Sequence, residues 1–261
     1  MITPDDIKRI AREKEVDPTT IERDYVQNWF LKSLYSNSDY LLFKGGTSIR
    51  KAFVQDYRFS DDLDFTLSKE VSQEEITELI NKSKTFVHDE IGVTFEDDTP
   101  FKDVESGWKV KLHYTSRVTG GPIKLIMDIT HSHLEKVITD FELHSMYHNY
   151  PDQCAVELKT YSLKEITTEK LRALCQRGWP RDLYDVYNLW PQVEKDIIQE
   201  IFIEKCKFKG FEPTLKSYDN NEESLRSAWA KSLDHQLKNI PDFDMVFQDV
   251  RKILKEELNV K

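Results

Sequence analysis

Two aspartates in one short segment are the residues of this 261-residue chain best suited to chemistry. Asp62 and Asp64 alternate with Leu63, Phe65 and Leu67, and alternation with period two is typical of a β-strand with one buried face. Both carboxylates therefore project from the other face, where they repel each other. A divalent cation would relieve this repulsion, and Mg²⁺ takes carboxylate oxygens and substrate phosphates as ligands. The segment predicts a metal site on a strand.

A glycine pair precedes this strand. The apolar run 41–43 leads into Gly45 and Gly46, and we expect a short helix to begin near Thr47 and Ser48. Glycine allows close approach of the backbone to a ligand, and a helix N-terminus presents N–H groups and a positive dipole end to an anion. Each feature alone is more often structural, a turn or a solvated strand face. Together they suit a nucleoside triphosphate and its metal ion.

A third carboxylate is expected from a later strand. Ile123, Leu125, Met127 and Ile129 share one face of that segment, which leaves Asp128 on the other. Antiparallel pairing in the same sheet would bring Asp128 beside the first two aspartates; the alternative is an exposed aspartate near a strand end. His131 and His133 follow it, and two histidines leaving a strand are more often surface residues than metal ligands.

Three stretches resemble the nucleotidyltransferase-fold toxins of the AbiEii family, which occur in abortive-infection and toxin–antitoxin systems. They are Lys44-Gly-Gly-Thr-Ser48, Arg58-Phe-Ser-Asp-Asp-Leu-Asp64, and the segment from Glu169-Lys170 through Arg181-Asp182 to Asp185. The resemblance extends from about Ile21 to Trp190. It implies an α+β fold with a nucleotidyltransferase-like N-terminal mixed sheet, flanking helices and a helical C-terminal part. We expect domains at 1–155 and 156–261, the second contributing Lys and Asp residues to the site.

The resemblance also implies roles for individual residues. Lys170 would contact the triphosphate, and either Asp182 or Asp185 would assist catalysis; the structural alternative is a helix pair of Arg181 with Asp185 and a solvated lysine. Asp62 and Asp64 would hold the metal ion, and Asp128 would either complete the metal site or polarise the incoming hydroxyl. The expected nucleotide-binding residues are Lys44, Gly45, Gly46, Thr47, Ser48, Arg58 and Ser60.

The function implied is transfer of a nucleotide from a nucleoside triphosphate to an acceptor, with Mg²⁺ or Mn²⁺ as cofactor. The resemblance implies a cytoplasmic toxin that acts on the 3′ end of tRNA and has a cognate antitoxin. Two alternatives remain open: the same chemistry on a protein or small molecule, and a non-catalytic protein of this fold that binds a nucleotide or a partner.

The composition indicates the general class of protein. With 39% hydrophobic and 32% charged residues the chain is typical of a globular protein. The net charge of −10 argues weakly against a protein that coats nucleic acid. The three separate cysteines fit a reducing cytoplasm, and no apolar run is long enough for a membrane span.

Several local patterns complete the predictions. Helices are expected to begin at Pro4, after Asp17-Pro18 and after the capping-box segment Ser72 to Glu75. Residues 97–106 and 210–221 are predicted as loops, 108–114 as a strand, and the chain beyond about 151 as helical. The lysines at 205, 207 and 209 are predicted as a solvated cluster or, alternatively, as a surface that faces RNA.

Overall fold

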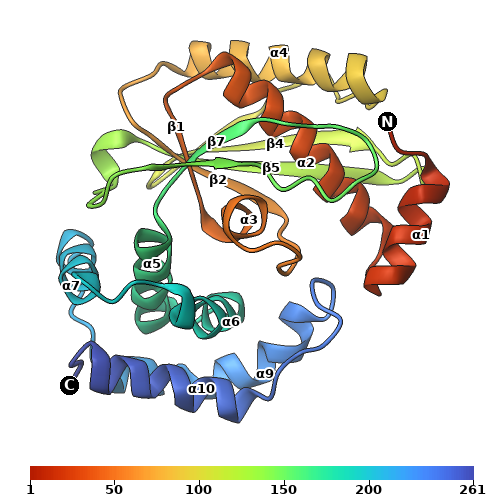
Figure 1. Ribbon diagram of the computed structural model, residues 1–261. Coiled ribbons are helices and arrows are strands. Elements are labelled where there is room, and N and C mark those ends of the chain that lie inside the picture. The colour runs from red at the N-terminus through yellow and green to blue at the C-terminus, as the bar shows by residue number, and fades with distance from the viewer. The chain divides into compact units, whose positions relative to one another are not determined.

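The computed structural model describes residues 1–261 and separates into two compact units, shown in Figure 1. The first unit comprises Met1–Glu135 and Phe141–Tyr161, and the second comprises Lys136–Asp140 and Ser162–Lys261. The first contains every strand and the second is helical, so the predicted α+β class is confirmed.

The first unit is built on one mixed sheet in the order β3-β4-β5-β2-β1-β7-β6. Strands β5 and β2, and β1 and β7, pair in parallel, whereas all other neighbours are antiparallel. The strands are β1 (Leu41–Lys44), β2 (Asp62–Leu67), β3 (Phe101–Val104), β4 (Gly107–Thr115), β5 (Pro122–Thr130), β6 (Glu142–Ser145) and β7 (Glu157–Thr160).

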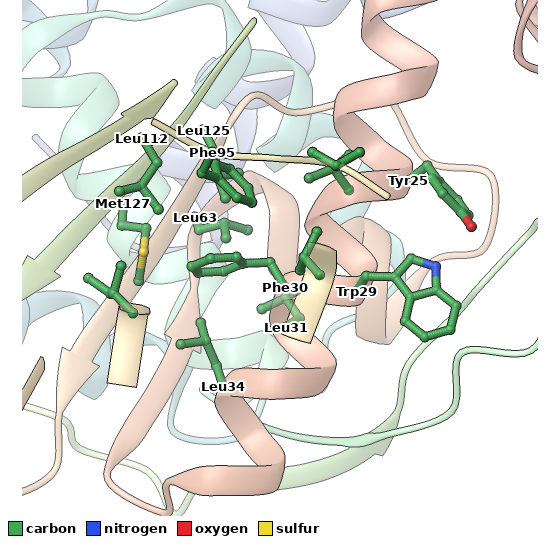
Figure 2. Close-up of a cluster of buried hydrophobic side chains, with 14 of the residues drawn as sticks. Tyr25, Trp29, Phe30, Leu31, Leu34, Leu63, Phe95, Leu112, Leu125 and Met127 are labelled. Carbon is green, nitrogen blue, oxygen red and sulfur yellow. The ribbon is translucent and has the colours of Figure 1, made fainter. Parts of the chain in front are cut away.

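The core of this unit lies between one face of the sheet and two long helices, α2 (Pro18–Asn37) and α4 (Gln73–Ile91). Figure 2 shows side chains of α2 meeting Leu63, Leu112, Leu125 and Met127 from β2, β4 and β5. Helix α2 is buried on nearly all sides rather than along one stripe. The alternation in β2 therefore turns its apolar residues to the helices and Asp62 and Asp64 to the other face.

Helix termini follow the predicted signals. Thr3 caps α1 (Pro4–Lys14), and Ser72 and Glu75 form the predicted capping box at the start of α4. On the opposite side of the sheet from α4, the short helix α3 (Gly45–Ser48) runs directly into a π-helical turn over Ile49–Phe53 (Figure 1).

The second unit contains only helices. They are α5 (Leu163–Arg177), α6 (Pro180–Leu189), α7 (Ile198–Phe208), α8 (Leu215–Asp219), α9 (Glu222–Leu233) and α10 (Phe243–Lys252). Gly178, at a left-handed φ of 60°, ends α5, and Pro180 begins α6, as the sequence predicts. Leu183, Val186 and Trp190 lie buried along α6.

Four local predictions are wrong. Residues 97–106 include the edge strand β3, residues 210–221 include α8, and β7 lies beyond position 151, where only helices are expected. Strand β5 runs parallel, not antiparallel, to β2. In each case the segment is short or its pairing direction is set by distant residues. No helix in the structure has the length and apolar character that crossing a membrane requires.

Candidate active site

The turn between β1 and β2 fits only glycine at its first two positions. Gly45 has a φ of +76°, and a Cβ atom there would lie 2.2 Å from Asp64 Oδ2. A Cβ atom on Gly46 would lie 2.7 Å from Arg58 Nη2 and 3.0 Å from Ser60 Oγ. The glycine pair therefore allows an aspartate, an arginine and a serine to close onto the backbone at the start of α3.

Charged residues face one another across four strands on the side of the sheet away from α2 and α4. Lys44 is the register partner of Asp64, Asp64 is the partner of Asp128, and Asp128 is the partner of Lys109. Because register partners share a face, these side chains form one row, with Asp62 two residues along β2 from Asp64. The backbone thus brings the three predicted aspartates onto one face, and the parallel pairing gives the same neighbours as the predicted antiparallel one.

The carboxylates do not form a ready set of three metal ligands. No group of three His, Cys, Asp or Glu side chains in the structure is placed to hold one ion. Asp128 is instead paired with Lys109, with 3.1 Å between Oδ2 and Nζ. Asp62 and Asp64 remain adjacent on one strand face, and their hard oxygen donors suit Mg²⁺ or Mn²⁺. The metal site stays a prediction, and the residues that fit it best are this pair.

Two predicted nucleotide-binding hydroxyls are used inside the turn. The Thr47 hydroxyl donates to the carbonyl of Asp62, and Ser48 Oγ donates to the carbonyl of Gly45 at 2.9 Å. Both residues are fully buried. The Thr47 hydroxyl holds the turn against β2, and the Ser48 hydroxyl closes the single turn of α3. A contact from this turn to a phosphate would therefore come from backbone N–H groups, and α3 has no side-chain hydrogen bond capping its N-terminus.

The two predicted basic residues of this unit are largely buried. Lys44 pairs with Glu135 at 3.8 Å between Nζ and Oε2 and lies 5.5 Å from the centre of the Tyr161 ring. Arg58 is 3% exposed and donates from Nη1 to the carbonyl of Phe59 at 3.1 Å. Both cations are thus held beside the glycine turn and β2.

Helix α2 supports the loop that leads into Asp62, a role that the sequence analysis missed. Gln27 donates to the carbonyls of Ser60 at 3.1 Å and Asp61 at 2.9 Å. Arg23 pairs with the Asp61 carboxylate. The sequence shows polar residues among the apolar ones of α2, and buried polar side chains need hydrogen-bond partners, but it does not show which partners they find.

A buried charge cluster fixes the other end of the turn. Asp24 on α2 accepts from Arg50 Nε at 2.8 Å, pairs with Lys51 Nζ at 2.7 Å and accepts from the Tyr150 hydroxyl at 2.7 Å. Burial alone would raise the pKa of Asp24, but the two cations outweigh it and hold that pKa well below its usual range. Burial lowers the pKa of Lys51 to about 8. The cluster ties the π-helical turn after α3 to α2.

The second unit gathers its own predicted residues into a buried cluster. Lys170 on α5 lies 2.6 Å from Asp185 Oδ2 and 3.0 Å from Asp182 Oδ1, both on α6. Arg177 also pairs with Asp182, at 3.3 Å. The Asp185 side chain is fully buried, whereas that of Asp182 is 7% exposed. The alternative with a solvated lysine is wrong, because the Lys170 side chain is only 10% exposed.

The remaining candidates differ in exposure: His133 is exposed, whereas Lys205 is buried. His131 and His133 stack with ring centres 5.6 Å apart, and His133 is largely exposed and pairs with Glu70. Lys205 does not belong to a surface cluster: it is 1% exposed and pairs with Glu165 at 2.5 Å and Glu169 at 2.9 Å. The prediction of a solvated cluster at 205–209 is therefore wrong for its first member.

Two solved structures share the fold of this chain. The structure of MenT4, a nucleotidyltransferase toxin from Mycobacterium tuberculosis, is 18% identical, with a TM-score of 0.68 over 99% of this chain and 90% of that chain. JHP933 from Helicobacter pylori is also 18% identical, with a TM-score of 0.61 over 94% of each chain. At this identity the likeness establishes the fold. No curated protein matches the sequence.

A family model shows which protein family the chain belongs to. The model of the AbiEii nucleotidyltransferase toxins, described as belonging to type IV toxin–antitoxin systems, matches residues 29–255. The match includes every candidate site residue of both units. The chain therefore belongs to the AbiEii family and is a nucleotidyltransferase of the toxin type.

Proposed function

We propose that this nucleotidyltransferase moves a nucleotide from a nucleoside triphosphate to the 3′ end of tRNA in a Mg²⁺-dependent reaction. The observation that carries the proposal is the closure of Asp64 against the Gly45 backbone, beside the uncapped start of α3. It supports the proposal because a turn suited to an anion and a pair of carboxylates would then belong to one strand–turn–strand unit.

The triphosphate would be held mainly by backbone and by buried cations. The N–H groups at the start of α3 are suited to phosphate oxygens. Arg58 and Lys44 flank the same turn and would neutralise further charge, as cations do in phosphoryl transfer generally. Ser60, whose Oγ lies against Gly46, would offer a hydroxyl. Ser48 and Thr47 would act indirectly, by holding the turn in shape.

Asp62 and Asp64 are the residues that would hold the metal ion. When bound, Mg²⁺ or Mn²⁺ would neutralise charge that develops on the triphosphate. The two aspartates lie two residues apart on a strand whose opposite face is packed against the core, and together they would hold the ion. That packing keeps both carboxylates in position before substrate arrives.

Asp128 is proposed to act on the acceptor. The acceptor hydroxyl oxygen attacks the α-phosphorus, the bond from that phosphorus to the bridging oxygen breaks, and pyrophosphate leaves. The hydroxyl proton must go to a base, and Asp128 is the carboxylate next to Asp64 across the strands. Lys109, whose Nζ lies 3.1 Å from Asp128 Oδ2, would orient that carboxylate. We therefore assign Asp128 to the acceptor rather than to the metal.

We extend the proposal to Lys170, Asp182 and Asp185 of the second unit. Lys170 would contact the triphosphate, as the family resemblance implies. Asp185 is fully buried against Lys170 and would hold it in place, whereas Asp182 keeps some exposure. We accordingly propose that Asp182 is the aspartate that assists catalysis.

The setting of the reaction is also proposed. Membership in a toxin family implies a cognate antitoxin that restrains the activity. Cys154, Cys175 and Cys206 are buried free thiols, which supports a reducing cytoplasm as the place of action.

The test is transfer of label from each of the four α-³²P-labelled nucleoside triphosphates onto bulk tRNA and onto total protein, with Mg²⁺ and with a chelator. We expect label at the tRNA 3′ end with the intact chain and Mg²⁺, and none with Asp62→Ala. The expected loss is catalytic because Asp62 is only partly buried, so the variant should fold. Label on protein instead of tRNA would refute the proposed acceptor, and full transfer by folded Asp62→Ala would refute the proposed site.

A further inference from the structure

One face of β4 carries basic residues at alternate positions. Lys109, Lys111 and His113 alternate with Val110, Leu112 and Tyr114, which are buried in the core. Alternation places the three basic residues on the face away from the core, at intervals of about 6.8 Å along the strand. This is the face on which the Asp128 and Asp64 side chains lie, because Lys109 is the register partner of Asp128.

Neighbouring strands extend the same surface. Lys102 on β3 is the register partner of Lys109, and Lys124 on β5 is the partner of His113. We call the five residues Lys102, Lys109, Lys111, His113 and Lys124 the cationic face. Strands are about 4.8 Å apart, so the face covers three strands, and the last of them, β5, is the direct neighbour of β2 and its two aspartates.

Most of this charge is not balanced locally. Lys109 pairs with Asp128, and His113 lies 3.5 Å from Glu96. Lys102, Lys111 and Lys124 are exposed and make no ion pair in the structure. The chain as a whole has a net charge of −10, so an unbalanced group of lysines runs against its average composition.

Protection of a sheet edge does not explain why these lysines share one face. Charged residues on an edge strand prevent pairing with other chains, and Lys102 lies on the edge strand β3. Strand β3 pairs only with residues 107–110 of β4, and β2 pairs only with residues 126–130 of β5, so Lys111 and Lys124 lie beyond those paired stretches. A charge can protect an edge from either face of the sheet, whereas these lysines all project on the face of Asp128 and Asp64.

We propose that the cationic face binds the sugar–phosphate backbone of a polynucleotide acceptor and guides its end to Asp128, Asp64 and Asp62. This rests on the proposed function, because it supplies the acceptor-binding surface for that reaction. A row of lysines at regular intervals contacts phosphates without reading bases. The bound strand would lie across β4 and β5, so its terminal hydroxyl would reach the row of carboxylates last.

The test compares two double variants in binding fluorescein-labelled bulk tRNA, measured by anisotropy from 0.05 to 1 M KCl. Lys111→Glu with Lys124→Glu reverses charge on the face. Lys69→Glu with Lys82→Glu makes the same change in total charge on exposed lysines, just after β2 and on α4. Two lost phosphate contacts should make the plot of log K against log salt less steep by about 1.4. The loss of affinity at 0.1 M salt should therefore exceed the loss at 1 M salt by about 25-fold. The control should stay closer to the parent chain, and affinity for Mg²⁺–nucleotide should not change in either.

The outcomes separate this inference from the function on which it rests. Equal loss of affinity in both double variants, or no loss in either, overturns the cationic face as the binding surface. Failure of the parent chain to bind tRNA, with label transferred to protein, overturns it while leaving nucleotidyl transfer intact. Binding of tRNA that depends on Lys111 and Lys124, without any transfer of label, supports the face and contradicts the proposed function.

Discussion

Substitution of Gly45 by alanine adds a single atom, Cβ, to the proposed site. The new Cβ atom would lie 2.2 Å from Asp64 Oδ2, whereas ordinary contact begins at 3.4 Å. The carboxylate must therefore move by at least about 1.2 Å (3.4 − 2.2) or the turn must open by as much. Either change displaces Asp64 from its place beside α3.

The expected effects on rate and stability differ in size. A displacement of about 1 Å at a catalytic group can reduce the rate by about 100-fold. Alanine at a left-handed position costs about 1–2 kcal/mol, against a typical unfolding free energy of about 5–15 kcal/mol. Gly45→Ala should thus remain folded while losing about two orders of magnitude in kcat.

A matched control separates the conformational cost of alanine at a left-handed position from the effect of the clash with Asp64. Gly120 has a φ of +72° and no atom within 4 Å of its would-be Cβ, so Gly120→Ala has the same conformational cost without the clash. Both variants are to be compared by thermal unfolding and by steady-state transfer of α-labelled nucleotide. Similar melting temperatures with activity lost only in Gly45→Ala support the reasoning. Activity in Gly45→Ala within about threefold of the control would refute it.

Three further predictions concern buried charge. Asp185→Asn should lower the free energy of unfolding by about 1–3 kcal/mol, because buried Lys170 loses its closest carboxylate but keeps Asp182 at 3.0 Å. Asp182→Asn should mainly lower kcat, and urea melts and transfer assays on both variants distinguish the two roles. Lys205→Met should lower the free energy of unfolding by about 3–5 kcal/mol, because it leaves the buried Glu165 carboxylate without its cation. Exposed Lys207→Met should change it by less than about 0.5 kcal/mol. The folded pKa of Asp24 lies below its unfolded value, so the carboxyl contributes stability above about pH 4 that is lost as pH falls toward the folded pKa. Urea melts from pH 6 to pH 2.5 should show a smaller acid loss in Asp24→Asn than in the parent chain, and equal slopes would contradict this assignment.

The parts of the fold with strong local periodicity were predictable. The alternation of Asp62 and Asp64 with apolar residues places β2 and its two faces correctly, and Ser72 marks the start of α4. The direction of β5 relative to β2 was not predictable, because alternation fixes which face a residue occupies but not which strand lies beside it. Short strands such as β3 and β7 have four residues each, too few for a clear period.

The buried charges were the main features missed at the site. Lys205 alternates with two other lysines, which suggests a solvated surface, yet it continues the buried stripe of Ile198, Ile201 and Phe202 at helical spacing. Gln27 and Asp24 are buried polar residues whose partners lie far away in sequence, so their role in holding the site becomes visible only when the chain is folded.

The central claim is that the α-phosphorus is the point of attack, and labelling the two ends of one triphosphate tests it most directly. Parallel reactions with α-³²P and γ-³²P nucleotide, bulk tRNA and Mg²⁺ should place the α-label on tRNA and release the γ-label in pyrophosphate, with both signals absent in Asp62→Asn. The γ-label on tRNA, or its release as orthophosphate with no α-label transferred, would contradict nucleotidyl transfer at this site.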